Sequence, residues 1–195
     1  MKEVEAAVLD AGSRLADAGW RVEEIEHTPP IHEAAEVQEA LWLGDGFSEL
    51  ANAAAREGDP GALATVAAVR AKAQSFPPDV VARSLLRRAT LTREWQLFLA
   101  RHPVLLLPVS AELPFPDGLD LQGEAGFQRV WNAQLVLRAL PVMGLPGLTV
   151  STKLIGSTPV GVQVVAARYR EDLCLLAGKA IEDRGTPPSP IDPTA

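Results

Sequence analysis

The chain has 195 residues, 47% hydrophobic and 22% charged, a balance typical of a globular protein with a substantial core rather than of a disordered chain. Its formal net charge of -7 and its pI of about 5.0 oppose nucleic-acid binding, which needs clustered Lys and Arg. No apolar run reaches the roughly 18 residues of a membrane span, and the acidic N-terminal stretch lacks the apolar segment of a signal peptide. We therefore expect a cytoplasmic protein that binds neither nucleic acid nor membrane.

The N-terminal section, residues 2–26, is expected to form a helix followed by a strand. Apolar residues recur at spacings of three and four over residues 2–18, which predicts an amphipathic helix, and Gly19 provides its C-terminal stop. Residues 20–25 then alternate, with Trp20 and Val22 on one face and charged residues between them. This pattern favours a strand near a sheet edge.

The middle section, residues 31–101, is expected to be helical. It is rich in Ala and Glu over residues 31–56, and a break is expected at Asp45-Gly46. Asp59 is suited to cap a helix that has Pro60 at its first position. After Pro77-Pro78 ends that helix, another is expected from Asp79 to about Arg101.

The C-terminal section, residues 103–184, is expected to be rich in strands. Residues 104–109 are continuously apolar, which is typical of a strand covered on both faces. A helix is expected over about 123–140 and an amphipathic helix over 168–184, with Glu171 and Asp172 in its first turn, where the helix dipole favours them. Residues 186–195 form a Pro-rich tail for which we expect flexibility.

Two Gly- and Pro-punctuated segments, Leu140–Val150 and Pro159–Val165, each lead into a short β-rich apolar run. We expect these runs to pair as neighbouring strands. The residues that we expect to shape the turns are Gly144, Pro146, Gly147, Pro159 and Gly161.

The order G-L-P-G, then P-V-G-V-Q-V-V, then R-E-D-L-C-L-L across residues 144–176 resembles the C-terminal part of the amidase signature family of amide hydrolases. The resemblance implies an α/β fold with four or five strands in a mixed sheet flanked by helices. We expect residues 1–185 to form a single domain of this kind. It also implies hydrolysis of a carboxamide C–N bond as the activity of the parent family.

The family's catalytic relay, a Ser nucleophile, a bridging Ser and a Lys base, does not match this chain. The relay lies in a Gly/Ser-rich stretch with the Lys upstream, whereas no Ser-Ser or Gly-Gly dipeptide occurs here. We therefore assign no catalytic residue. The three histidines lack metal-ligand spacing, so no metal and no cofactor are expected. Cys174 falls in an apolar helical stripe and is expected to be a buried, inert thiol.

The resemblance places four residues beside the family's substrate pocket. These candidate pocket-border residues are Trp131, Asn132, Met143 and Leu145. The alternative interpretation is that they only pack an apolar helix and turn.

Three functions remain open from the sequence. The chain is expected to be a truncated amidase fragment that is inactive alone, or the partner half of a split amidase. It could instead be a non-catalytic interaction protein on the same scaffold, because an incomplete sheet leaves an open edge and an uncovered apolar face. Each favours a homo-oligomer or a companion chain. A third class is an unrelated α/β enzyme that shares only the turn pattern. The sequence does not specify the substrate.

Overall fold

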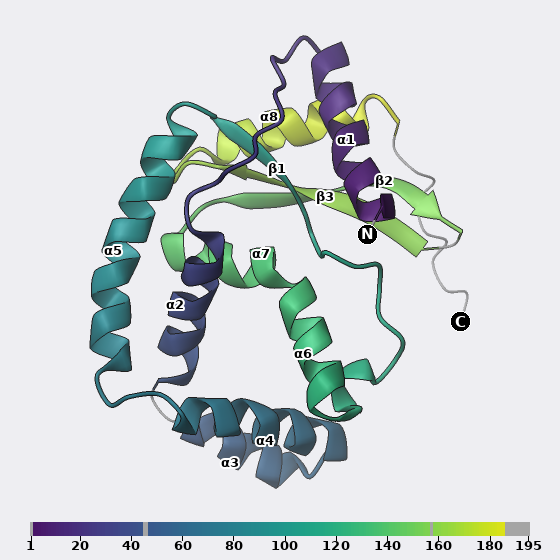
Figure 1. The fold of residues 1–195 in the computed structure, drawn as a ribbon. Helices are drawn as coiled ribbons and strands as arrows, with labels where there is room; N and C mark the ends of the chain where they lie inside the picture. Colours follow the sequence, from purple (N-terminus) through teal and green to yellow (C-terminus); the bar gives the residue numbers. More distant parts are fainter. Residues whose placement is uncertain (1, 45–46, 157, 186–195) are drawn as a thin grey trace. The chain divides into compact units, whose positions relative to one another are not determined.

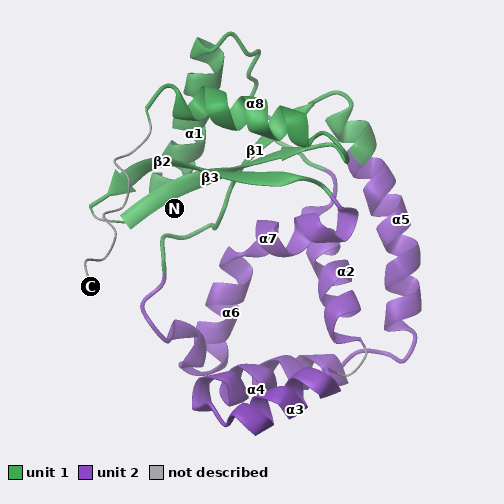
Figure 2. Ribbon diagram, turned by 180° about the vertical axis from the view of Figure 1, so that it is seen from behind, with its two compact units in different colours: residues 1–28, 96–114, 145–195 green, residues 29–95, 115–144 purple. Residues whose placement is uncertain are grey.

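The computed structural model describes residues 2–44, 47–156 and 158–185, which divide into two compact units. Unit 1 comprises Met1–Thr28, Gln96–Pro114 and Leu145–Ala195, and unit 2 comprises Pro29–Trp95 and Phe115–Gly144 (Figure 2). The chain therefore leaves unit 1 and returns to it twice. That the whole of residues 1–185 forms one domain stays a prediction, and the Pro-rich tail 186–195 lies outside the described residues.

Unit 1 is built on a three-stranded antiparallel sheet with the order β1-β3-β2 (Figure 1). Its strands are β1 (Val104–Pro108), β2 (Gly147–Ile155) and β3 (Thr158–Ala166). The expected pairing is confirmed, because Gly147 lies opposite Val165 and Ser151 opposite Gly161. The α/β fold class is also confirmed, although every pairing in the described residues is antiparallel and the sheet has three strands, fewer than the four or five expected.

Two helices, α1 (Lys2–Asp17) and α8 (Glu171–Glu182), cover one face of this sheet. Their small and apolar residues meet the valines of β2 and β3 in one buried cluster, because alternate strand residues point to the same face. The members of this cluster are Ala7, Ala11, Leu15, Val150, Val160, Val162, Val164, Ala166, Cys174, Ala177 and Ile181. Both helices lie close to their predicted bounds, and Gly19, with φ +88°, follows the end of α1 as expected.

One strand expectation in unit 1 was wrong, and another is met only in part. Residues 20–25 form no strand, since an extended segment becomes one only when a neighbouring ladder satisfies its backbone groups, and no such neighbour is present among the described residues. The expected cover on both faces of β1 is met in part: Leu105 is buried, at 7% exposure, and Val104 and Leu106, which point to the opposite face, are half-buried against the core cluster. β1 lies at an edge of the sheet, so its outer side has no partner strand in the described part of the chain.

Five glycines and prolines of the C-terminal section were expected to shape turns, but the structure gives them different roles. Gly144, with φ +63°, ends a 3₁₀ helix and is a turn residue. Pro146 accepts a hydrogen bond from the Ala166 amide at 3.3 Å, just before Gly147 opens β2. Pro159 and Gly161 were wrongly expected in a turn, since both lie in β3 and pair with β2.

Unit 2 is helical in its described residues. Its elements are α2 (Ile31–Leu43), α3 (Ser48–Glu57), α4 (Pro60–Gln74), most of α5 (Val80–Leu99), η1 (Leu119–Leu121), α6 (Gly123–Ala133), α7 (Leu135–Ala139) and η2 (Leu140–Met143). The cap of α4 is confirmed: the Asp59 side chain accepts a hydrogen bond from the Ala62 amide at 2.7 Å, with Pro60 at the first position. The expected break at Asp45-Gly46 lies outside the described residues, but α2 ends at Leu43.

Within unit 2, α2 packs against α7 and η2, while α4 contacts α2, α3 and η1 (Figure 1). The single helix expected over 123–140 is divided into α6, α7 and η2. No helix among the described residues has both the length and the apolar character needed to cross a membrane.

Candidate functional site

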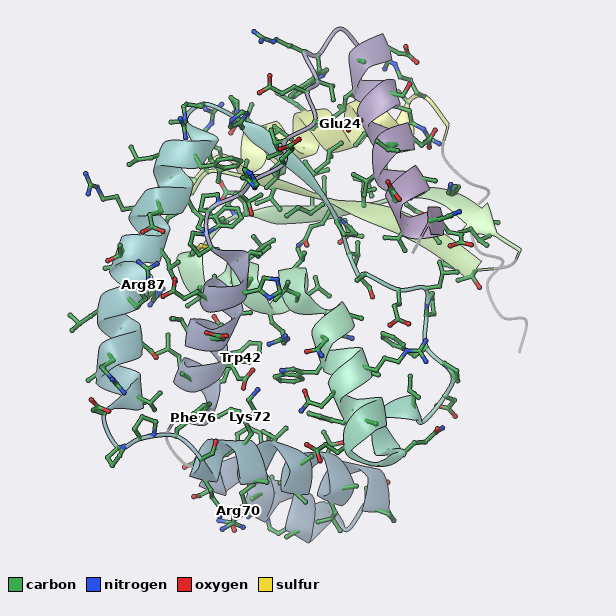
Figure 3. All side chains as sticks on the ribbon, viewed as in Figure 1. Glu24, Trp42, Arg70, Lys72, Phe76 and Arg87 are labelled. Carbon is green, nitrogen blue, oxygen red and sulfur yellow. The ribbon has the colours of Figure 1, made fainter. Side chains whose placement is uncertain are left out.

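The most chemically distinctive place in unit 2 is a buried carboxylate, Glu39 of α2, held by cations and a ring N–H from three other helices. Glu39 is 4% exposed. Its Oε2 accepts hydrogen bonds from Trp131 Nε1 of α6 at 3.1 Å and from Arg138 Nη1 of α7 at 3.3 Å. Its Oε1 pairs with Lys72 of α4, which reaches toward α2 in Figure 3. A buried carboxylate needs such partners, because removing a charge from water costs several kcal/mol.

The Arg138 guanidinium is held from two further directions. It lies 4.7 Å from the centroid of the Trp131 ring, and its Nε donates to the Trp131 carbonyl oxygen at 3.1 Å. Burial lowers the pKa of Arg138 and the Glu39 carboxylate opposes that shift. The arginine remains charged because its ordinary pKa is far above neutrality. This cluster of Glu39, Lys72, Trp131 and Arg138, here the Glu39 cluster, ties together α2, α4, α6 and α7.

A second charged group joins α2 to α5 nearer the surface. Arg87 donates from Nε and Nη2 to the two carboxylate oxygens of Glu33, both at 2.6 Å, and from Nη1 to Glu94 at 3.2 Å (Figure 3). The hydrogen bonds from Arg87 lower the pKa of Glu33, and the same contacts raise the pKa of Arg87. The pair is bidentate, the geometry in which arginine holds a carboxylate most firmly.

The four expected pocket-border residues have different environments. Trp131 is half-buried in the Glu39 cluster and stacks on Phe127 with ring centroids 5.4 Å apart. Asn132, next to it on α6, is exposed. Met143 is 1% exposed and therefore packs in the interior. Leu145 is half-buried and belongs to unit 1. That these residues border a substrate pocket stays a prediction. Trp131 and Asn132 both keep accessible surface and both belong to unit 2.

No nucleophile–base pair is evident among the described lysines and Cys174. Lys72 is engaged by Glu39, and Lys179 pairs with Asp183 at 2.8 Å. Cys174 is buried as expected, with its Sγ 3.6 Å from the Val164 carbonyl oxygen. Burial raises the pKa of this thiol, so it resists forming the nucleophilic thiolate. In the described part of the chain, no group of three or more His, Cys, Asp or Glu side chains is arranged to hold a metal ion.

Sequence reasoning missed Glu39 and Arg138 as members of a cluster. A signal was present for Glu39, because Ala35, Glu39 and Leu43 recur at a spacing of four and share one helix face, and Ala35 and Leu43 are buried. A carboxylate within an apolar stripe predicts a buried counterion. Nothing in the sequence indicates that this counterion comes from a residue 99 positions away.

Two curated proteins similar to this chain are both indoleacetamide hydrolases. The chain is 31% identical over 194 residues to an indoleacetamide hydrolase of Bradyrhizobium diazoefficiens, an alignment that covers 93% of this chain and 34% of the relative. It is 40% identical over 93 residues to an indoleacetamide hydrolase of Bradyrhizobium japonicum, covering 47% of this chain and 20% of that protein. The chain thus spans about a third or less of the length of these curated relatives.

The fold is similar to that of solved hydrolases. A structure of 6-aminohexanoate cyclic dimer hydrolase complexed with substrate matches 93% of this chain and 41% of its own length, with a TM-score of 0.64 and 21% identity. The family model described as Amidase matches residues 1–175, which is most of the sequence. The expected resemblance is confirmed, and the chain belongs to the Amidase family.

Proposed function

We propose that this chain is a non-catalytic part of a carbon–nitrogen hydrolase of the Amidase family and that it hydrolyses no amide by itself. The observation that carries the proposal is a contrast. The family match extends over residues 1–175, yet the sequence holds no Ser-Ser or Gly-Gly dipeptide from which the family's nucleophile loop could form. The catalytic residues would come from another part, on the same polypeptide or on a companion chain.

The relatives suggest the substrate class. Two of them are indoleacetamide hydrolases, so we propose a primary carboxamide carried on an aromatic group as the substrate of the complete enzyme. Trp131 and Asn132 are our candidates for the pocket border. Asn132 is exposed and offers an amide donor and acceptor, while Trp131 has its indole N–H engaged by Glu39 and so presents ring surface rather than a donor.

The test measures ammonia released from indole-3-acetamide by the purified chain, alone and after co-expression with the part of the Bradyrhizobium diazoefficiens hydrolase that lies outside the aligned region. We expect no release by the chain alone and release by the combination. Hydrolysis by the chain alone, abolished when one of its own serines or lysines is replaced by alanine, refutes the proposal.

A second candidate function is that of a non-catalytic oligomerising protein. Exposed apolar side chains favour it: on α8 of unit 1, Leu175 and Leu176 are 63% and 59% exposed, and on α5 of unit 2, Leu86 is 76% exposed. Light scattering coupled to size-exclusion chromatography distinguishes the candidates. A stable homo-oligomer that gains no activity with the hydrolase part favours this function, and a monomer contradicts it.

A further inference from the structure

The helix α8 has one buried and one exposed side. The buried residues recur at spacings of three and four and lie on the side that contacts the sheet of unit 1 (Figure 2). They are Cys174, Ala177, Gly178 and Ile181. The exposed residues recur at the same spacings on the opposite side, here called the outer face of α8. They are Asp172, Leu175, Leu176, Lys179 and Asp183. In the described part of the chain, this outer face is accessible to another molecule.

Two adjacent leucines at the centre of the outer face favour association. Leu175 is 63% exposed and Leu176 is 59% exposed. Their burial between two molecules is favourable because apolar surface leaves water. A contact limited to one helix face is smaller than the roughly 1,200 Å² at which standard stable interfaces begin. We therefore expect a weak and reversible complex.

Charged residues are placed symmetrically around these leucines. Asp172 lies three residues before Leu175. Lys179 lies three residues after Leu176. A two-fold axis that passes between the two leucines sets two copies of α8 antiparallel, and it places Asp172 of each copy opposite Lys179 of the other. A parallel pair would instead set Asp172 against Asp172 and Lys179 against Lys179, and like charges repel. The charges therefore select the antiparallel pair.

The contacts that these charges make within one chain are compatible with this arrangement. Asp172 pairs with Arg170 at 2.9 Å, and Lys179 pairs with Asp183 at 2.8 Å. Asp172 and Lys179 are 56% and 72% exposed in their side chains, and such exposed pairs are weak, so both groups can also bond across the axis. The turn before α8 adds an exposed cation, Arg168, and the antiparallel pair brings it toward Asp183 of the other copy.

We propose that the chain forms an antiparallel homodimer through the outer face of α8. The leucines of both copies supply the apolar contact, and the charges fix its orientation and register. The net charge of -7 opposes association at long range, but salt screens that repulsion beyond about 8 Å at physiological ionic strength, whereas the pairs across the axis are close. The inference does not depend on the proposed function, because it holds whether or not the complete enzyme hydrolyses an amide.

Sedimentation velocity of the full chain measures the dimerisation over about 1–1,000 µM, the range expected for a small interface. We expect Leu176→Asp to weaken the dimer at least about tenfold, because it brings a carboxylate against a leucine of the other copy. The matched control is Leu9→Asp, which changes a leucine of α1 that is 51% exposed. The control should change the dissociation constant by less than about twofold.

An exchange of charges tests the antiparallel register. Asp172→Lys and Lys179→Asp each replace both unlike pairs of the dimer with like charges, so each variant alone should self-associate at least about fivefold more weakly. In an equal mixture, a dimer of one copy of each variant has unlike charges at both pairs again. This mixed dimer should form within about threefold of the affinity of the unmodified chain.

Three results would overturn the proposal. They are a monomer over the whole concentration range, a dimer that Leu176→Asp leaves unchanged, and a mixture of the two charge variants that associates no more tightly than either variant alone. Thermal unfolding of each variant verifies that it is folded, so a loss of the dimer reports on the outer face of α8.

Discussion

Replacing Gly161 with alanine tests whether β2 and β3 approach as closely as the structure indicates. Gly161 lies in β3 opposite Ser151, next to an irregularity in the pairing between Ser151 and Lys153. A Cβ atom at position 161 would lie 2.5 Å from the Val150 carbonyl oxygen, 3.1 Å from its carbon and 3.3 Å from the Ser151 Cα. All three neighbours are main-chain atoms, so no side-chain rotation relieves the contact.

The magnitude follows from two opposing effects. Overpacking of this kind costs about 1–3 kcal/mol, and the rigid backbone neighbours place Gly161→Ala at the upper end. Alanine also restricts the backbone of the unfolded chain more than glycine does, which stabilises the folded state by about 0.4–1 kcal/mol and offsets part of this cost. We therefore expect a net loss of about 2 kcal/mol, which lowers the midpoint of thermal unfolding by about 4–8 °C for a chain of this size.

The assay compares thermal and urea unfolding of the unmodified chain, Gly161→Ala and the control Gly12→Ala. At position 12, in the interior of α1, a Cβ meets only Val22 Cγ1 at 3.6 Å, an ordinary contact. Because alanine is favoured over glycine in a helix by up to about 1 kcal/mol, the control should be neutral or stabilising. Gly161→Ala with unfolding free energy within about 0.5 kcal/mol of the unmodified chain refutes the close approach.

Three further outcomes are expected. Glu39→Gln leaves the Arg138 guanidinium buried without its carboxylate and should lower the unfolding free energy by about 3 kcal/mol. The control Glu36→Gln, on the exposed face of α2, should change it by less than about 0.5 kcal/mol. Equal losses for the two variants in urea unfolding contradict the role assigned to the Glu39 cluster. The pKa of Glu33 is lowered in the folded chain, so the stabilisation from its ion pair with Arg87 is present above the unfolded pKa and is lost as pH falls through the folded pKa. Glu33→Gln should therefore lower the unfolding free energy by less than about 1 kcal/mol at neutral pH and leave it unchanged in strong acid. A loss of unfolding free energy that grows as pH falls contradicts this reasoning. Cys174 should be alkylated by iodoacetamide far more slowly in the native chain than in urea, as followed by mass spectrometry, and equal rates argue against its burial.

Local signals predicted most of the helices and their ends. Asp59 and Pro60 start α4, Gly19 follows α1, and Asp172 lies in the first turn of α8. The burial of Cys174 was also predicted, from the apolar stripe around it. Each of these features depends on residues within about one helical turn, because helix hydrogen bonds join positions four apart.

Features that need a distant partner were predicted less well. Residues 20–25 have the alternating pattern of a strand but belong to no ladder. Pro159 and Gly161 are residue types common in turns, yet both lie in β3 and pair with β2. A strand is defined by its neighbour, so the same alternating pattern forms no strand when the described part of the chain supplies no neighbour for it. The four candidate pocket residues were suggested by the family resemblance, and the structure buries Met143 while leaving Asn132 exposed.

By itself, the sequence determined the family, the α/β class, the helix ends and the lack of the family's catalytic dipeptides. Only the tertiary structure decided that β1 is an edge strand, that Gly161 lies against the Val150 carbonyl, and that Glu39 meets Arg138. The physical reason is the range of the interactions. Periodicity, caps and composition act within a few residues, whereas ladders, close backbone contacts and buried ion pairs depend on the path of the chain between partners far apart in sequence.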